Sequence, residues 1–515
     1  MRLYLFGLFH FDQRFVLLTA DRAGPQRHRS LEATVAWSYN LLDETQRCAL
    51  RHVAVFAGPV DFALVNSIWP DSPTSLMKAL TELVDRSMVA TTRQGATTKY
   101  RLLDTIRTFT LDRSKAIGDL DELRRHHAEA FASKAESVRT LLRGAHEADA
   151  VKTLDTWWPE LRTAVGWCIE ANEPSIAIRL VAGFGFEAVF RERREVLDWA
   201  EQVLSLPDIL ACPDADELLG TSAMADWGFG NFERGWDRAR HAVLLHKERK
   251  TAPTPDVLAA HPLHQAMTEN LAASLASLQA HEREAQAGTV PFSEAHLLCC
   301  QAMAHAYVGC CDKAEPLLRR ADAIAITTAN PLLQTIVAFT RAIAVLDGDP
   351  ARAVEFAEES LRLARSVRAT WFETASTNYL TAAMVRVGDI HVAAGQLIET
   401  LDRLMHGATS QSAANTLRNT VVVLDRLGVP ERAAAVVGWL EQNHPAIPGT
   451  PGMRDHPAML SDLLRRDLGI TRANELIEAG SLLTLPHAIA VARQELVAVA
   501  EPTTPKETYL SAPQE

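Results

Sequence analysis

Gly348-Asp349-Pro350-Ala351-Arg352-Ala353 is one of four similar stretches that recur along the second half of the chain. The other three begin at Gly309, Gly388 and Gly428, so that successive glycines are 39, 40 and 40 residues apart. Helical patterning flanks each glycine, and a period of this length is typical of stacked pairs of α-helices. The sequence therefore predicts an α-solenoid in this part of the chain.

The residues of one repeat explain why two helices should meet there. Gly348 is expected to supply the left-handed residue that ends one helix, Asp349 can cap the next, and Pro350 suits its first turn. The apolar stripes that follow cannot be buried by a lone helix pair, so the pairs must stack. Solenoids mostly bind other proteins. We therefore expect a non-enzymatic scaffold or regulator that binds a protein partner or an inducer through its repeats.

Composition narrows the choice of partner. The chain has 515 residues, of which 47% are hydrophobic, enough for several buried cores. Its formal net charge is −12, but residues 1–145 carry 20 Lys or Arg against 16 Asp or Glu, which leaves −16 for the remainder. An acidic helical region is not expected to hold nucleic acid, because neutralising phosphates requires a basic surface.

Cysteine usage and the N-terminus bear on the compartment. Seven cysteines, several within helical patterns, and the lack of a secretory signal indicate a reduced setting. The apolar stretch Met1–Phe9 is too short to span a bilayer and has no small-residue cleavage site. We therefore expect a cytoplasmic protein that makes no membrane contact.

A different pattern precedes the helical repeats. A basic linker is expected at residues 22–29, since Gly24-Pro25 halts regular structure, and Ser30 can cap the helix that follows. Helical patterns up to about residue 87 then lead into two β-prone segments, Met88–Thr92 and Thr97–Leu102, around a glycine turn. Three helices closed by a β-hairpin make a winged-helix unit.

Five stretches carry a resemblance to a known family: Arg14–Thr19, Arg29–Leu42, Val55–Gly58, Leu80–Met88 and Tyr100–Arg107. Through them the chain resembles the large actinobacterial STAND regulators, NB-ARC ATPase proteins of the LuxR and AfsR type. The resemblance extends over nearly the whole chain and is generic in the repeats. It implies an ATPase core, then a winged helix, then tetratricopeptide-like repeats, often followed by a LuxR-type helix-turn-helix.

The fold class expected is thus mainly α, a winged-helix domain followed by a tetratricopeptide-like α-solenoid. This chain is expected to begin at the tail of the ATPase core and to stop about where the helix-turn-helix would start. The predicted parts are a remnant of the core tail with the basic linker (1–29), the winged-helix domain (30–118), degenerate helix-pair repeats (119–290), tetratricopeptide-like repeats (291–440), a C-terminal helical cap (441–500) and a disordered tail (501–515).

The nucleotide-binding residues are where the chain departs from this family. No Gly-x-x-x-x-Gly-Lys-Ser/Thr sequence occurs in it, and no apolar strand ends in paired acids for magnesium. The family's Met-His-Asp stretch, which contacts nucleotide, corresponds to Leu102-Leu103-Asp104, and Leu103 cannot donate to a phosphate. We therefore expect no cofactor and no ATP hydrolysis by this chain alone. A separate nucleotide-binding ATPase chain would then be a partner.

Two groups of residues are candidates for contact with nucleic acid or phosphate. The third helix of the winged helix, about residues 74–87, offers only Lys78 and Arg86 for DNA, opposed by Glu82 and Asp85. The alternative is that this helix packs against neighbouring domains. Basic residues of the linker and the aspartate that ends the winged helix could contact a nucleotide or phosphate, or the linker could simply be solvated. These candidates are Arg22, Arg27, His28, Arg29 and Asp104.

Metal and catalytic sites are not expected. Cys299-Cys300 and Cys310-Cys311 are adjacent pairs, and adjacent helical residues point about 100° apart, which disfavours chelation of one ion. Cys48 and His52 can share a helix face, but no third orienting group accompanies them. His126-His127 is expected to lie on the surface or to serve helix packing. Tryptophans within helical patterns are expected to be core wedges, though some could line a binding groove; they are Trp157, Trp158, Trp199, Trp227 and Trp236.

Overall fold

A computed structural model describes residues 25–95, 97–405, 410–443 and 456–500. Arg22 with the rest of residues 1–24, residues 444–455 within the predicted C-terminal cap and the predicted tail at 501–515 lie outside these ranges. The chain divides into two compact units: unit 1 is Met1–Glu136 with Asp155–Leu180, and unit 2 is Ser137–Leu154 with Val181–Glu515. Helices α7 (Leu120–Leu142) and α8 (Glu147–Glu170) contribute residues to both.

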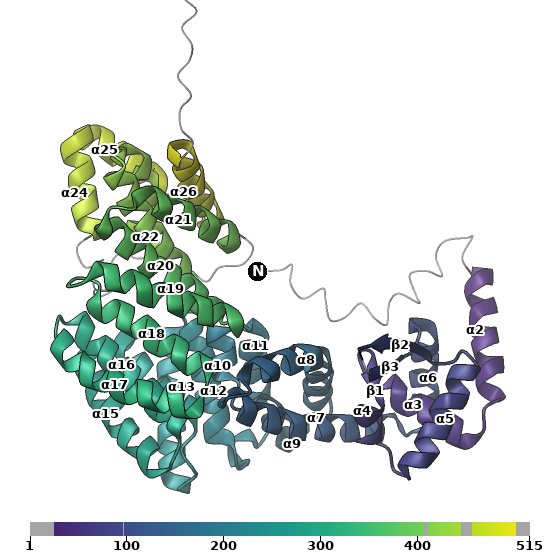
Figure 1. Ribbon diagram of the computed structural model, residues 1–515. Helices are drawn as coiled ribbons and strands as arrows, with labels where there is room; N and C mark the ends of the chain where they lie inside the picture. Colours follow the sequence, from purple (N-terminus) through teal and green to yellow (C-terminus); the bar gives the residue numbers. More distant parts are fainter. Residues whose placement is uncertain (1–24, 96, 406–409, 444–455, 501–515) are drawn as a thin grey trace, which may run out of the picture. The chain divides into compact units, whose positions relative to one another are not determined.

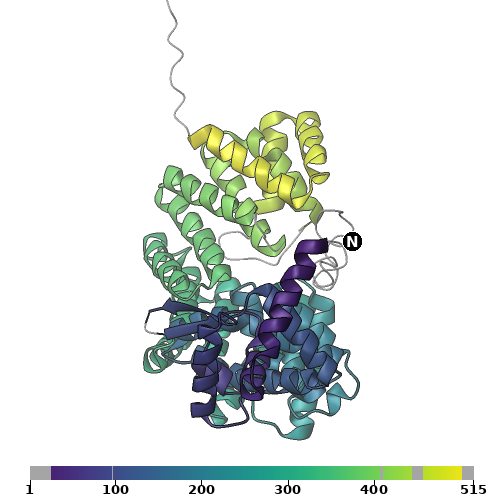
Figure 2. The same cartoon turned by 90° about the vertical axis from the view of Figure 1, so that its right-hand side faces the viewer.

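Unit 1 contains a winged helix, as predicted. Its elements are α2 (Pro25–Asn40), α3 (Glu44–Ala54), β1 (Val60–Asp61), α4 (Phe62–Asn66), α5 (Pro73–Asp85), β2 (Ala90–Gln94), β3 (Thr97–Arg101) and α6 (Asp104–Ile117). Strand β3 lies between β1 and β2, and both pairings are antiparallel. Strands β2 and β3 project from the helices as a hairpin (Figures 1 and 2).

Local sequence signals start two of these helices. The side chain of Asp43 accepts from the backbone N–H of Gln46, and the Gln46 side chain accepts from the backbone N–H of Asp43, which closes a capping box on α3. Ser72 caps α5, with Pro73 in its first turn. The apolar faces of α3 and α5 then meet in a core that includes Leu50 and Leu80, both fully buried.

One expectation for unit 1 was wrong, and one strand was not predicted. Helix α2 begins at Pro25, not after Ser30, so that Arg27, His28 and Arg29 belong to a helix and not to a linker. Proline has a fixed φ that fits the first turn of a helix, so Gly-Pro here precedes a helix instead of interrupting one. The sheet also has a third strand, β1, whose two residues are too few to give an alternating pattern.

A buried carboxylate fixes the turn after α3. Glu160, on α8, accepts hydrogen bonds from the backbone N–H groups of Ala57 (2.8 Å) and Gly58 (2.9 Å). Its Oε2 also lies 2.9 Å from Nε2 of His127, a buried residue of α7. His127 therefore has a packing role, as the sequence predicted.

Unit 2 is an array of helix pairs that follow one another in chain order (Figure 1). Helix α9 (Pro174–Val181) belongs to unit 1 except for Val181. The segment of unit 2 before the pairs holds α10 (Gly185–Phe190), α11 (Arg194–Leu204) and the 3₁₀ turn η1 (Ile209–Ala211). The pairs are α12 (Ala215–Gly228) with α13 (Phe232–Arg249), α14 (Pro255–Thr268) with α15 (Leu271–Ala287), α16 (Pro291–Tyr307) with α17 (Cys311–Thr328), α18 (Pro331–Val345) with α19 (Pro350–Ser366), and α20 (Thr370–Val387) with α21 (Ile390–Leu404).

Further helices close the array toward the C-terminus. They are α22 (Ser410–Arg426), the 3₁₀ turn η2 (Pro430–Ala433), α23 (Ala434–Asn443), α24 (His456–Leu468), α25 (Ile470–Ser481) and α26 (Leu485–Ala500). Helices α23 and α25 cross so closely that a Cβ atom on Gly438 would lie 1.9 Å from the carbonyl oxygen of Ile477. The predicted mainly α fold, with a winged helix and a helical repeat array, is confirmed.

The repeat glycines do what the sequence predicted in three of four copies. Gly309, Gly388 and Gly428 have positive φ, of 78°, 99° and 76°. Gly348 does not, because the turn after α18 is closed by hydrogen bonds from the backbone N–H groups of residues 348 and 349 to the Val345 carbonyl without a left-handed residue. Asp349 nevertheless caps α19, where its side chain accepts from the backbone N–H of Arg352 at 3.1 Å.

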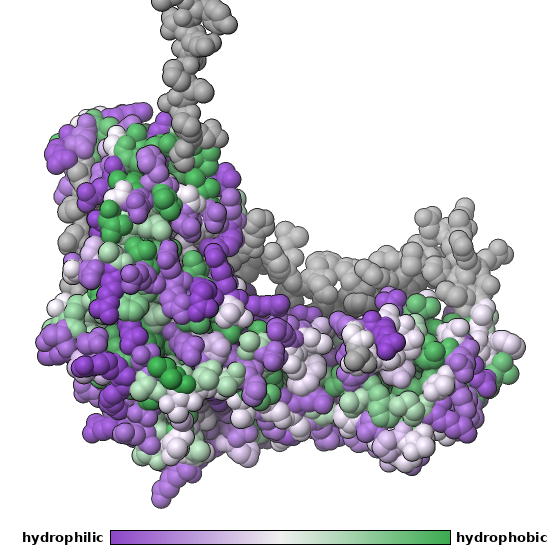
Figure 3. Space-filling model, in the orientation of Figure 1, coloured by the Kyte–Doolittle hydropathy of each residue, from purple (hydrophilic) through white to green (hydrophobic). Residues whose placement is uncertain are grey.

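The first helices of the pairs are more deeply buried than the second. Most residues of α12, α16, α18 and α20 are buried, whereas α13, α17 and α19 each keep one exposed side. We call the face made by α12, α14, α16, α18 and α20 the inner face. On the face of unit 2 seen in Figure 3, hydrophilic and hydrophobic residues are mixed. None of the described helices is both long enough and apolar enough to cross a bilayer.

Candidate functional site

The predicted DNA-contacting residues lie on the surface of unit 1. Lys78 is exposed on α5, and Arg86 follows the last residue of that helix and donates through Nη1 to the carbonyl of Leu41 (3.4 Å). The other exposed residues of α5 are small, apolar or acidic: Pro73, Thr74, Met77, Thr81 and Asp85. On its exposed side, α5 thus presents the cation of Lys78 and no amide side chain. The DNA contacts of Lys78 and Arg86 remain predictions.

The predicted phosphate-contacting residues that the structure describes belong to two helices, α2 and α6. Asp104 is exposed in the first turn of α6, where the preceding residue, Leu103, makes no side-chain cap. Arg27, His28 and Arg29 lie along the first turns of α2. Their role in contacting a nucleotide or phosphate remains a prediction.

The thiols do not form an activated or metal-binding group. Cys48 Sγ lies 3.6 Å from Nδ1 of His52, but burial raises the pKa of the thiol and lowers that of the imidazole. Cys299 and Cys300 are buried, and burial raises the pKa of Cys300 to about 12. In the described ranges, no group of three or more His, Cys, Asp or Glu side chains is arranged to hold a metal ion.

The most elaborate arrangement of side chains lies on the inner face of unit 2, where α10 is seated. All six residues of α10 are buried. Phe186 packs edge-to-face against Phe292 of α16, with ring centroids 5.2 Å apart, and Phe190 lies 4.8 Å from Phe372 of α20. Phe339 of α18 extends the same cluster, 5.4 Å from Phe372. One short helix therefore contacts several repeats at once.

An arginine at the end of α10 ties distant segments together. The guanidinium of Arg191 forms ion pairs with Glu147 at the start of α8 and with Glu187 on α10, and its Nε donates to the carbonyl of Val367 (3.0 Å). Oε2 of Glu147 in turn accepts from the backbone N–H of Leu332 (2.8 Å). All three charged side chains are almost completely buried.

Burial sets the protonation of this network. It raises the pKa of Glu147 to about 7, against the attraction of Arg191 and the hydrogen bond from Leu332. The pKa of Arg191 is raised by the two carboxylates, although burial alone would lower it. Removing Arg191 would therefore leave Glu147 buried without its cation, whereas Glu187 would keep Arg193, whose Nε lies 3.5 Å from Oε2 of Glu187.

A second set of polar groups holds the segment that precedes α10. The backbone N–H of Gly183 donates to Thr221 Oγ1 (2.7 Å), and that of Gly185 donates to Oδ2 of Asp256 (2.8 Å). Thr221 also donates to the same carboxylate oxygen, at 2.7 Å. Asp256 is fully buried, and desolvation raises its pKa. Its other oxygen, Oδ1, accepts no hydrogen bond among the described residues.

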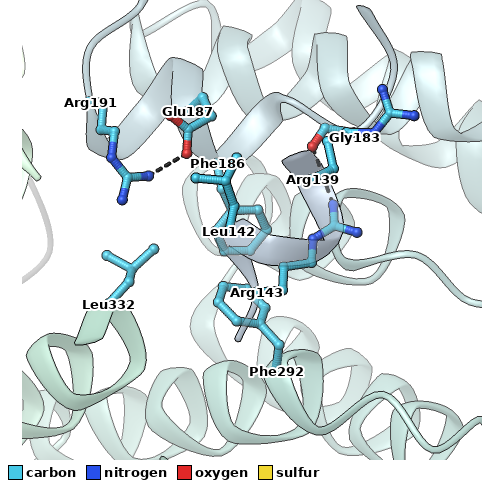
Figure 4. A pocket seen from close by; sticks show the side chains of 9 residues that line it. All are labelled: Arg139, Leu142, Arg143, Gly183, Phe186, Glu187, Arg191, Phe292 and Leu332. Atoms are coloured by element: carbon cyan, nitrogen blue, oxygen red, sulfur yellow. Dashed lines mark hydrogen bonds and ion pairs between the residues drawn. The ribbon is translucent and has the colours of Figure 1, made fainter. Parts of the chain in front are cut away.

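A small cavity lies beside α10 (Figure 4). It has room of about 20 Å³ for water, enough for one molecule. Its lining combines apolar side chains, three arginines and a glutamate: Arg139, Leu142, Arg143, Gly183, Phe186, Glu187, Arg191, Phe292 and Leu332. Arg143 donates to the carbonyl of Gly183 (3.2 Å), so the cavity wall is itself hydrogen-bonded to the segment before α10.

Sequence patterns did not predict this site. Trp227, one of the tryptophans considered as groove residues, packs against the aromatic cluster around α10, with its ring centroid 6.2 Å from that of Trp371. Its key residues, Arg191 and Glu147, are isolated charges in chain regions without a motif. The one available signal is compositional, since Phe186 and Phe190 stand four residues apart with Glu187 and Arg191 beside them.

Comparison with known proteins assigns part of the chain. A family described as "Winged helix-turn-helix domain" matches residues 42–115. A Mycobacterium tuberculosis (strain H37Rv) protein that is provisionally named as an HTH-type transcriptional regulator is 32% identical over 200 residues, 38% of this chain and 22% of that protein. Its Mycobacterium bovis counterpart matches to the same extent.

Two further similarities are weaker. An uncharacterized Mycobacterium tuberculosis protein is 26% identical over 133 residues, 25% of this chain and 34% of that protein. A crystal structure of a STAND protein with a tetratricopeptide repeat sensor from Pyrococcus horikoshii aligns with 85% of this chain and 66% of its own, at 13% identity and a TM-score of 0.41. That score is too low to support an argument. The chain spans about a fifth of the length of the regulators that it matches.

Proposed function

We propose that this protein is a non-catalytic regulatory module related to STAND transcriptional regulators of the LuxR and AfsR type. In this proposal, the helical array binds a protein partner or an inducer. The winged helix relays that event to a nucleotide-binding ATPase domain carried on another chain. The observation that carries the proposal is the joining of a matched winged helix to a long helical repeat array within these 515 residues.

Several features support a binding role over a catalytic one. His52 and Cys300 are buried and Cys48 is partly buried, and burial moves the pKa of each group away from reactivity. The buried charged residues beside α10, Arg191, Glu147 and Glu187, are ion-paired with one another instead of facing an open cleft. Repeat arrays expose extended surfaces that suit protein partners.

Partner binding can be tested with the purified full chain. Size-exclusion chromatography coupled to light scattering, and affinity capture from a native extract followed by purification of the captured protein, should give a defined complex or self-association. A monomer that captures nothing reproducibly would contradict the proposal. In the same preparation, ATP or ADP should leave the melting temperature unchanged, since the proposal expects no nucleotide to bind this chain. A nucleotide that bound only the folded state would raise the melting temperature.

DNA binding through the winged helix is the second candidate function. The family match and the names of the mycobacterial relatives favour it. The face of α5 argues against it, because Lys78 is the sole cation within that helix and specific readout uses Arg, Lys, Asn or Gln. A gel-shift assay decides between them: sequence-selective, salt-sensitive binding to duplex DNA would establish the second candidate.

A further inference from the structure

Helix α10 sits on the inner face as a bound peptide would sit in a groove. We propose that α10 is a releasable occupant of that face, and that the surface under it receives a helix of a protein partner with aromatic side chains four residues apart and an arginine directly after the second. The proposal rests on the proposed function, because it names where the array would bind its partner and what that partner would present.

The chemistry of the partner follows from what α10 itself presents. Phe186 and Phe190 lie one turn apart and enter a wall of rings from α16, α18 and α20, which includes Phe292, Phe339 and Phe372. Residues spaced by four share one face of a helix. A helix in a groove is typically recognised through such anchors.

The arginine adds direction to this recognition. Arg191 Nε donates to the carbonyl of Val367, and its guanidinium meets the buried carboxylate of Glu147. Both acceptors belong to the surface and not to α10. A partner helix that supplied an arginine at the same place would satisfy them, whereas one without it would leave the Glu147 carboxylate buried and unpaired.

Two non-glycine residues near the C-terminal end of α10 have left-handed backbone conformations. Glu192, directly after Arg191, has φ of 51°, and Arg368, directly after Val367, has φ of 54°. Neither is glycine, and a non-glycine residue in this region costs free energy that the contact must supply. The side chain of Glu192 is hydrogen-bonded to Thr370, so the two strained turns are joined to each other.

The packing around α10 is also incomplete. The water-sized cavity lies against Phe186 and Glu187, and Oδ1 of Asp256 accepts no hydrogen bond among the described residues. A six-residue helix has little stability of its own, so α10 is ordered by the surface that it covers. Strain, a void and an unsatisfied carboxylate oxygen all lower the free energy needed to release it.

A peptide-binding experiment tests the proposal. A fluorescein-labelled peptide with the sequence of residues 182–194 is titrated with the full-length protein, and fluorescence anisotropy gives the Kd. In the wild type, α10 competes at the high effective concentration of a tethered segment. Removing one anchor with Phe190→Ala weakens that competition. We expect the Kd for the peptide to fall at least tenfold in the variant.

Two controls make the result specific. A peptide in which Phe186 and Phe190 are replaced by serine should bind neither protein. The variant Leu397→Ala removes a fully buried side chain from a different core cluster, so it loosens the array without touching α10 and should leave the peptide Kd unchanged. If Phe190→Ala does not fold, Phe190→Leu keeps most of the volume and should still lower the Kd about threefold.

The outcomes separate this proposal from the proposed function. A folded Phe190 variant that binds the peptide no better than the wild type, or a Leu397→Ala variant that gains equally, would overturn the release of α10. A natural partner that binds wild type and Phe190→Ala with the same Kd would also overturn it, while supporting the proposed function. Peptide binding at the inner face without any natural partner would support the groove and count against the proposed function.

Discussion

Replacing Arg191 by methionine should destabilise unit 2 strongly at neutral pH and much less in mild acid. The substitution removes the cation between Glu147 and Glu187, whose side chains are 0% and 4% exposed, and leaves both carboxylates buried. Breaking a buried ion pair from one side costs about 3–5 kcal/mol. For a large domain this corresponds to a fall in melting temperature of roughly 6–10 °C at pH 7.5.

The pH dependence follows from the direction of the pKa shift. Burial raises the pKa of Glu147 to about 7 even with Arg191 present, and Arg191 opposes that rise. Without the arginine the pKa moves higher still. A carboxyl group whose pKa is raised by folding contributes stability that is complete below its unfolded pKa and is lost as the pH rises through its folded pKa. At pH 5.5 the carboxyl is therefore neutral in the variant, and most of the penalty disappears.

Differential scanning calorimetry at pH 7.5 and pH 5.5 measures both effects. Arg362→Met is the matched control, since Arg362 is exposed and, within the part of the chain that the structure describes, pairs with its helix neighbour Glu359 alone. It should leave the melting temperature unchanged at both pH values. An Arg191→Met variant that melts with the wild type at pH 7.5, or that is equally destabilised at both pH values, would refute the reasoning.

Three other perturbations test separate parts of the structure. Gly438→Ala should lower the free energy of unfolding by about 1–3 kcal/mol, because its methyl group would meet the Ile477 carbonyl at the crossing of α23 and α25, whereas Gly395→Ala, which has open space around it, should raise it by about 1 kcal/mol. Urea unfolding should show shifts of opposite sign for the two variants, and equal shifts would contradict this. Burial lowers the pKa of His296 to about 4, so the wild type should lose stability as the pH falls from 6.5 to 4, and His296→Leu should lose less. If the melting temperatures of the two proteins fall in parallel over that range, the assignment is wrong. Glu160→Gln should destabilise unit 1 by about 1–3 kcal/mol, because an amide oxygen cannot accept all the hydrogen bonds that the carboxylate accepts. Limited proteolysis near residues 55–60 should therefore become faster, and an unchanged rate would argue against this role of Glu160.

Local signals in the sequence were sufficient for the framework of the fold. The 40-residue spacing of the repeat glycines predicted helix pairs, and the cap at Asp349 was predicted from residue type alone. These signals act over three or four residues, where side chain and backbone meet regardless of the rest of the molecule. The β2–β3 hairpin was predicted on the same basis, from β-prone segments around a glycine.

The inner face could not be predicted from such signals. Arg191 and Val367 are 176 residues apart, and Leu332 meets Glu147 across 185. No periodic pattern links positions so distant, and their contact depends on how many helix pairs separate them and how each pair is turned. The left-handed conformations of Glu192 and Arg368, which follow the ends of α10 and α19, could not be predicted from residue type either, since neither residue favours that conformation.

Hydrogen–deuterium exchange on the full chain is the most direct test of the idea that the inner face is a binding surface covered by a releasable helix. If α10 opens while the array stays folded, amides in residues 183–194 will exchange at least tenfold faster than those of α12 and α16, which are equally buried. If they exchange at the same rate as those two helices, α10 opens only when the array unfolds, and the account of the inner face is wrong.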